Sequence, residues 1–151
     1  MSVTNREIYT SALSLIGETA NNENIADYEE RAPYLIASFC SSNTSLDKKI
    51  RKAEDLSNAA RFSPIYLSLE RDFPLCDILA SAAALYTASM LTIDEDDDLS
   101  DSLYDKYCDT MASLNASYSA EEQRIVIVPE PESTPAPIAN LESIKDVYFF
   151  D

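Results

Sequence analysis

Apolar residues recur at helical spacing in four stretches of this chain of 151 residues. The first stretch has a capping signal at each end. Thr4 and Glu7 stand at the spacing of a capping box, and Gly17, the only glycine, follows the last apolar residue, where a helix favours a left-handed C-cap. The pattern therefore predicts a helix over residues 5–16.

Three further helices are predicted from the same periodicity. One covers residues 28–41, where Pro33 should either kink the helix or mark its true first turn. The next opens at residues 72–74, ends near residue 92 and is rich in alanine, which is typical of a central helix that neighbours approach on several sides. The last covers residues 100–118.

The remaining segments are less regular. Residues 43–58 permit a short helix, and residues 62–71 alternate around Pro64 as a short extended segment. Residues 124–128 (RIVIV) are of strand type, and a Pro-rich linker over residues 130–137 leads to an apolar stretch at residues 138–151. The predicted fold is mainly α: a four-helix bundle-like domain over residues 1–120, then a short β-strand and an extended tail over residues 121–151.

Composition excludes several function classes. The chain has 11 Lys and Arg against 27 Asp and Glu, a formal charge of −16, and no histidine. Walker-type phosphate loops and the GxGxxG fingerprint need several glycines in one loop, so one glycine excludes both. The lack of histidine excludes Ser-His-Asp and Cys-His catalysis and His-based zinc sites. We therefore expect no enzyme activity and no cofactor.

The charge also bears on partners and location. Non-specific nucleic-acid binding and docking on anionic membranes both depend on basic residues, so neither is expected. The longest uncharged run, residues 78–93, has 16 residues and falls short of the ~20 of a membrane span. The polar first ten residues do not have the apolar region of a signal peptide. Cys40, Cys76 and Cys108 are odd in number and far apart, which indicates free, buried thiols in a reducing compartment.

An acidic run at residues 94–98 invites a calcium interpretation. Oxygen-bearing side chains fall at the ligand positions of an EF-hand loop, namely Asp94, Asp96, Asp98, Ser100, Ser102 and Asp105. The pattern departs from that loop at Leu99, where glycine is usual, and at Asp105, where glutamate is usual. A solvated acidic loop leading into a helix N-terminus is the simpler interpretation, and calcium binding stays open as an alternative.

Other charged residues also have alternative interpretations. Glu29 with Glu30, or Asp101 with Asp105, could form an acid–base pair, although surface carboxylates are far commoner than catalytic ones. The only basic cluster consists of Lys48, Lys49, Arg51 and Lys52. This cluster could contact DNA, pair with an acidic loop of the same chain or a neighbour, or simply be solvated.

The C-terminal region suggests docking on another protein. The predicted strand (Arg124, Ile125, Val126, Ile127 and Val128) has no evident partner within the chain and could add to the sheet of another chain. The apolar residues near the end (Val147, Tyr148, Phe149 and Phe150) could dock elsewhere as well. The alternative is that both segments fold back onto the helical domain.

Three segments together resemble the head-to-tail connector, or adaptor, proteins of tailed bacteriophages. They are TNREIYTSALSLIGE (residues 4–18), DYEERAPYLIASFC (residues 27–40) and DFPLCDILASAAALYTASMLTIDEDDDLSDSLYDKYCDTM (residues 72–111). They stand in the order of the family and fall within the first 118 residues. The resemblance does not extend past residue 121.

The resemblance implies a structural virion protein at the junction of capsid and tail, assembled in the bacterial host cytoplasm. Family members form a ring, usually twelve-fold, under the portal protein, extend the DNA channel and present a surface to the next neck or tail protein. In several of them the C-terminal segment reaches the portal, a role that would suit residues 124–128 and 147–150. The family has no catalytic residues to transfer, and DNA would pass through the channel without specific binding.

The charge pattern fits such a ring. A negative lumen repels the DNA backbone and lets DNA slide. In a ring one face of a subunit meets a different face of its neighbour. We therefore hypothesise that the basic cluster of one subunit lies near the acidic run (Asp94, Asp96, Asp97 and Asp98) of the next.

An alternative function comes from a different class. The charge of −16 would also suit an acidic DNA-mimic or inhibitor protein that occupies the nucleic-acid site of an enzyme. That hypothesis predicts a monomer or dimer and assigns no use to the C-terminal segments. A calcium-regulated binding module is a third, weaker option.

Overall fold

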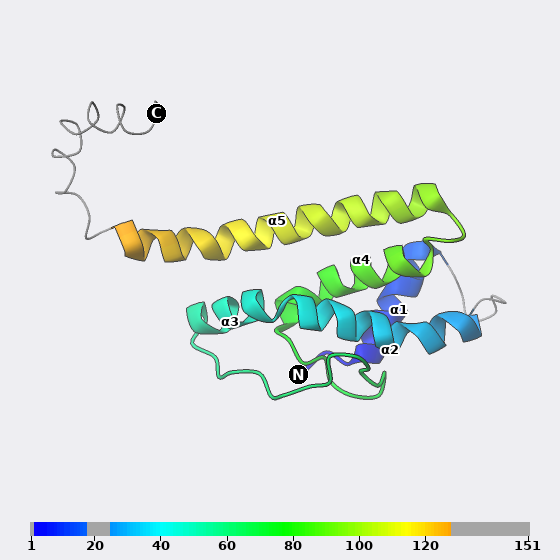
Figure 1. The fold of residues 1–151 in the computed structure, drawn as a ribbon, viewed down its shortest axis with the longest axis horizontal. Coiled ribbons are helices and arrows are strands. Elements are labelled where there is room, and N and C mark those ends of the chain that lie inside the picture. The colour runs from blue at the N-terminus through cyan, green and yellow to red at the C-terminus, as the bar shows by residue number, and fades with distance from the viewer. Residues whose placement is uncertain (1, 18–24, 128–151) are drawn as a thin grey trace, which may run out of the picture. The chain divides into compact units, whose positions relative to one another are not determined.

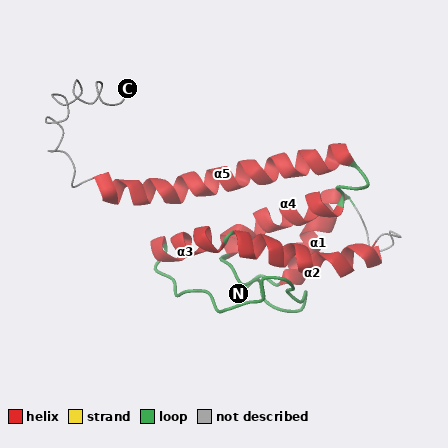
Figure 2. Cartoon of the chain, viewed as in Figure 1, coloured by secondary structure: helices red, strands yellow, loops and turns green. Residues whose placement is uncertain are grey.

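A computed structural model describes residues 2–17 and 25–127, with the backbone alone over 120–127. The described chain is mainly helical, and no β-strand occurs in these two ranges (Figure 2). In chain order the elements are α1 (Asn5–Ile16), α2 (Ile25–Ser42), α3 (Thr44–Ala53), the 3-10 helix η1 (Asp77–Leu79), α4 (Ala80–Leu91) and α5 (Asp97–Ile127), as Figure 1 shows.

Helix α1 has the predicted bounds and both predicted caps. The Thr4 side chain accepts a hydrogen bond from the Glu7 backbone N–H at 3.1 Å, and the Glu7 side chain accepts one from the Thr4 N–H at 2.9 Å. At the other end Gly17 adopts φ 77°, and its N–H donates to carbonyls of the last turn. Both predictions are confirmed because each cap depends only on residues a few positions away.

Helix α2 begins at Ile25, earlier than predicted, and continues through Pro33. A proline in a helix interior removes one hydrogen bond and costs about 3 kcal/mol. Burial of the apolar face offsets that cost, since Tyr28, Ile36 and Phe39 are almost completely buried. The Pro33 carbonyl also accepts a hydrogen bond from the Leu67 N–H at 3.1 Å, which ties α2 to the loop over residues 54–76.

That loop differs from the sequence prediction. Residues 62–71 form no strand; the one bridge among the described residues joins Thr4 to Asp72. The predicted helical start at residues 72–74 is also wrong, because helical structure begins at Asp77. The preceding backbone groups bond to α3 instead: the Pro74 carbonyl accepts from Arg51, and the Cys76 N–H donates to Asp47.

Helix α4 is buried on most of its surface, as its alanine content predicts. It packs against both α1 and α2, and Ala82, Ala83 and Ala88 are buried. Leu103 of α5 reaches the same core, where it packs with Ala12 and Ala88. Small residues on α4 let its neighbours approach closely.

Helix α5 is much longer than predicted. It begins at Asp97 and runs to Ile127, so Arg124, Ile125, Val126 and Ile127 are helical where the sequence pattern predicts a strand. Extending an existing helix needs no new nucleation, and β-branched residues lower helix propensity by only tenths of a kcal/mol each. Val128 lies outside the described residues.

The chain divides into two units, Met1–Asn115 and Ala116–Asp151. The first unit contains α1 to α4 and most of α5. The second contains the last part of α5. The predicted four-helix bundle and the predicted boundary near residue 120 stay predictions.

Candidate functional site

The basic cluster lies on α3, but its four residues are not equivalent. Lys48 and Lys52 are exposed and make no ion pair with any described residue. Lys49 is half-buried and has a partner within the chain. Arg51 points inward.

Arg51 does not belong to a basic surface. Together with Asp47 it forms a buried ion pair that bonds to the loop over residues 54–76, and we call this pair the clamp. Its Nε lies 2.8 Å from Oδ2 of Asp47, whose side chain is only 3% exposed. The two Nη atoms donate to the Ser57 and Pro74 carbonyls at 2.9 and 3.2 Å. The other Asp47 oxygen accepts the Cys76 N–H at 2.8 Å. The clamp thus holds the loop over residues 54–76 against α3, so placing Arg51 in an intermolecular contact is wrong.

The acidic run forms the turn between α4 and α5 and the start of α5. Asp94, Asp96, Asp97 and Asp98 are all exposed, as predicted for a solvated acidic loop. Asp96 also caps α5, since its Oδ1 accepts the Leu99 N–H at 3.1 Å. Glu95, in the same turn, accepts a hydrogen bond from the Tyr28 hydroxyl near the start of α2.

This geometry does not suit an EF-hand loop. A calcium loop must wrap around the ion, whereas residues from Asp97 onward are helical. Ser100 is buried, and its hydroxyl donates to the Ser89 carbonyl at 2.8 Å. Across the described ranges, no three or more Cys, Asp or Glu side chains converge on a possible metal site.

The acidic turn and the exposed lysines of α3 stand at opposite ends of α2. The turn touches Tyr28 at the start of α2, and α3 begins directly after its end (Figure 1). Helix α2 has 18 residues and is therefore about 27 Å long. That separation far exceeds the screening length of about 8 Å at physiological salt. The two groups therefore do not pair within one chain.

A row of carboxylates follows the acidic turn along α5. The exposed residues Asp97, Asp101, Asp105 and Asp109 are four positions apart and share one side of the helix. Like charges at this spacing destabilise a helix by tenths of a kcal/mol per pair. The row therefore destabilises α5, and its presence indicates a role outside folding, either binding of a positively charged partner or repulsion of a negatively charged one.

A groove in the loop over residues 60–74 was not predicted from the sequence. Its volume is about 600 Å³, and its lining includes Arg61, Phe62, Tyr66, Arg71, Phe73 and Pro74. Neither arginine forms an ion pair with a described residue, and both are exposed. One feature of the sequence could have indicated this groove. Two arginines ten positions apart stand on either side of aromatic residues that belong to the segment predicted to be extended.

An aromatic stack crosses the first unit from α5 to this groove. Tyr104 contacts Tyr107 with ring centroids 5.4 Å apart, and Tyr107 contacts Phe39 at 6.1 Å. Phe39 in turn stacks on Phe73 at 6.4 Å, and Phe73 lines the groove. Tyr104 at one end of the stack is 41% exposed.

The three cysteines are free, and Cys40 and Cys76 are buried as predicted, whereas the prediction of a buried thiol is wrong for Cys108, which is exposed on the surface of α5. Burial raises the pKa of Cys40 to about 12. Burial, helped by Asp47, raises the pKa of Cys76 to about 11. Cys108 on α5 is exposed, so it is the thiol that reagents can reach.

The C-terminal residues predicted to dock on the portal lie largely outside the described ranges. Arg124, Ile125, Val126 and Ile127 have a helical backbone, while Val147, Tyr148, Phe149 and Phe150 are not among the described residues. The carboxylates weighed as acid–base pairs are exposed: Glu29 contacts Arg6, and Asp101 and Asp105 stand on α5.

Comparison with known proteins supplies no relative. No family model, curated protein or solved structure matches the chain. Within the described ranges, no helix combines the length and apolar character needed to cross a membrane.

Proposed function

We propose that the chain is a structural virion protein, a head-to-tail adaptor whose copies form a ring under the portal. The ring would extend the DNA channel and join the capsid to the next neck or tail protein. The sequence resemblance supports this proposal, because its three segments coincide with α1, with α2, and with η1, α4 and the first half of α5. We further propose that these helices form a four-helix bundle-like domain.

The observation that carries the proposal is the separation of exposed charges along α2. Lys48 and Lys52 stand beyond one end, and Asp94, Asp97 and Asp98 stand near the other. Surfaces of opposite charge at opposite ends favour a head-to-tail contact between copies, and such contacts close into a ring when the rotation permits. The hypothesised contact between subunits then involves the exposed Lys48 and Lys52 and the acidic turn, without Arg51.

The excess of acidic residues, which gives the chain a charge of −16, would suit the channel wall. DNA carries one negative charge per about 1.7 Å of its axis, and a negative wall repels it without binding. DNA would then slide past the ring with no base contacts. We propose no catalytic role, since the chain has no histidine.

Portal binding is assigned to the C-terminal region. Arg124, Ile125, Val126, Ile127 and Val128, with Val147, Tyr148, Phe149 and Phe150, are the proposed contact residues. Since residues 124–127 are helical here, the proposed contact no longer requires strand pairing.

The first experiment mixes the chain with its cognate portal and images the product by electron microscopy. The adaptor hypothesis expects a ring on the portal; a monomer that ignores the portal would overturn it. Deleting residues 124–151 should leave the helical domain folded, by circular dichroism, and abolish portal binding.

A charge-reversal series tests the contact between subunits. The double variant K48E/K52E should impair ring assembly, and reversing Asp94 and Asp97 to lysine should restore it. Arg51→Glu is a poor interface test, because it would disrupt the buried clamp with Asp47. If the paired reversal restores nothing, the lysines and the acidic turn do not meet.

The carboxylate row also favours one second candidate, an acidic DNA mimic. In that case the chain would be a monomer or dimer and would inhibit a DNA-processing enzyme in competition with DNA. Neutralising Asp101 and Asp105 to asparagine would abolish inhibition. In an adaptor the same change would leave portal binding intact.

A further inference from the structure

We infer that the groove over residues 60–74 of one copy receives the Tyr104 side of α5 from a second copy. This inference says where the centre of the contact between subunits lies in the proposed ring. It rests on the proposed function only in requiring that copies of the chain associate. The two surfaces match in charge, in apolar character and in their places on the chain.

The charges of the two surfaces are complementary. The groove presents Arg61 and Arg71, neither of which forms an ion pair with a described residue. Asp72 is the one carboxylate in its lining and accepts a hydrogen bond from Ser2 at 3.3 Å. On α5, Asp101 and Asp105 are exposed and flank Tyr104. A surface with one aromatic ring and two carboxylates would thus meet a groove lined by aromatic rings and two guanidinium groups.

The apolar parts of the two surfaces also match. Tyr66 lines the groove and makes an edge contact with Tyr34 at 5.1 Å, and Ile65 beside it is 67% exposed. Tyr104 is 41% exposed on the other surface. Exposed large apolar side chains in groups indicate interaction sites, and tyrosine and arginine are enriched where binding energy concentrates.

Both surfaces are held rigid by the same aromatic stack. Tyr104 rests on Tyr107, and Phe73 at the groove rests on Phe39, which contacts Tyr107. A side chain already held in place loses less entropy on binding, so both surfaces are preorganised. The clamp of Arg51 and Asp47 fixes the loop that contains the groove.

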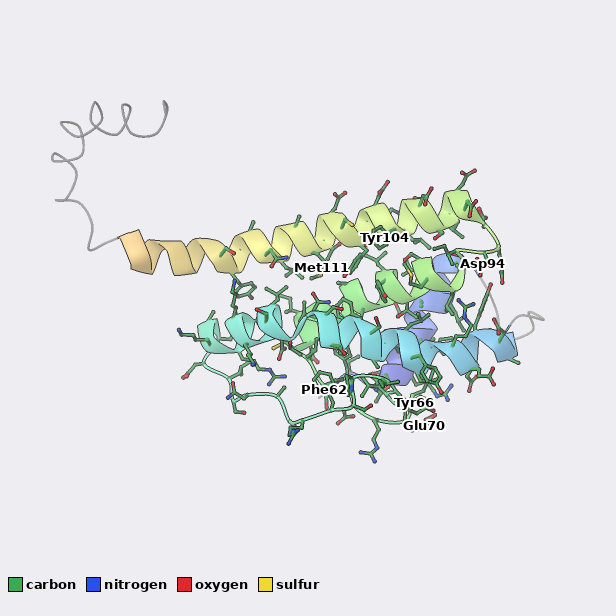
Figure 3. The ribbon with its side chains drawn as sticks, viewed as in Figure 1. Phe62, Tyr66, Glu70, Asp94, Tyr104 and Met111 are labelled. Atoms are coloured by element: carbon green, nitrogen blue, oxygen red, sulfur yellow. The ribbon has the colours of Figure 1, made fainter. Side chains whose placement is uncertain are left out.

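The two surfaces lie on opposite sides of the first unit. Figure 3 shows Phe62 and Tyr66 on the side of α2 that faces away from α5, where Tyr104 lies. One copy therefore cannot fill its own groove with its own α5. Two complementary surfaces at different places on the same chain make a heterologous contact, the type that builds rings.

The test uses two full-length charge-reversal variants, R61E/R71E and D101K/D105K, in sedimentation velocity. Each alone should self-associate at least ten-fold more weakly than the wild type, because its own two surfaces repel. An equimolar mixture should associate again, since each reversed surface finds its complement on the other variant, and any closed ring should contain an even number of subunits. Wild-type-like association of R61E/R71E, or no association in the mixture, would overturn the inference.

Control measurements distinguish loss of the contact between subunits from misfolding and from the effect of a changed net charge. The equimolar mixture is itself the control for general charge, because the charge changes of R61E/R71E and D101K/D105K are equal and opposite. Tyr104→Ala should weaken association, while Ile78→Ala, at an apolar residue of similar exposure, should not. Circular dichroism melts verify that each variant is folded.

A direct readout comes from Cys108, one helical turn beyond Tyr104 and exposed. In the contact its alkylation by iodoacetamide should slow several-fold at high protein concentration, and R61E/R71E should abolish that protection. Unprotected Cys108 in wild-type assemblies would overturn the inference and leave the ring intact. Complementary association of the two variants without any portal binding would instead overturn the proposed function.

Discussion

The buried pair of Asp47 and Arg51 gives the sharpest stability prediction. We consider Asp47→Ala, which removes a carboxylate that is 3% exposed. The change takes away two hydrogen bonds of 2.8 Å, one from Arg51 Nε and one from the Cys76 N–H. Arg51 keeps its bonds to the Ser57 and Pro74 carbonyls, so the loop loses its anchor on α3 only in part.

The expected loss follows from these contacts. Breaking a buried ion pair by removing one partner costs about 3–5 kcal/mol, and a buried N–H left without an acceptor accounts for about 1–3 of that. Because Arg51 is 16% exposed and keeps two carbonyl partners, we expect the lower end, about 3 kcal/mol. For a chain of this length the melting temperature should fall by about 6–12 °C. Asp47→Asn, which can still accept from Cys76, should lose about half as much.

Urea unfolding followed by circular dichroism measures the change, with Lys48→Ala as control. Lys48 is the exposed neighbour on α3, and its loss should stay within about 0.5 kcal/mol. The double variant D47A/R51M should lose less than the sum of the single losses, with a coupling of about 1–3 kcal/mol. A loss below about 1 kcal/mol for Asp47→Ala, or strictly additive losses, would refute the clamp.

The remaining predictions concern the caps and the thiols. Gly17→Ala should cost about 1 kcal/mol in urea unfolding, because alanine is strained at φ 77° while nothing within 4 Å obstructs its methyl group; a neutral result would contradict that backbone geometry. Thr4→Ala should cost about 1 kcal/mol through the lost cap, with Thr4→Ser as a near-neutral control. A thiol reagent at pH 8 should modify one cysteine, Cys108, in the folded chain and three after unfolding; rapid reaction of a second thiol would place Cys40 or Cys76 at the surface. The free energy of unfolding should fall as pH rises from about 9, because the Cys40 thiol has a pKa of about 12 in the folded chain but ionises near 8.5 in the unfolded chain. The variant Cys40→Ala should make the free energy of unfolding depend less on pH. An unchanged pH dependence in this variant would contradict the raised pKa of Cys40.

The sequence by itself determined the features that depend on near neighbours. Helix α1 has the predicted bounds because Thr4, Glu7 and Gly17 act within one turn of its ends. The exposed acidic turn and the mainly helical class also followed from local composition. The absence of histidine and of a glycine-rich loop excluded whole classes of chemistry on composition alone.

Only the tertiary structure decided the features that depend on distant contacts. The basic cluster gave no sign that Arg51 alone turns inward, because its partners at Ser57 and Pro74 belong to a loop that periodicity does not place. The same contacts delay the helical start to Asp77, and burial of α2 lets the helix pass through Pro33. The groove between Arg61 and Arg71 exists because that loop is held in one conformation. Such features result from burial and from hydrogen bonds between segments far apart in the chain, which no local pattern records.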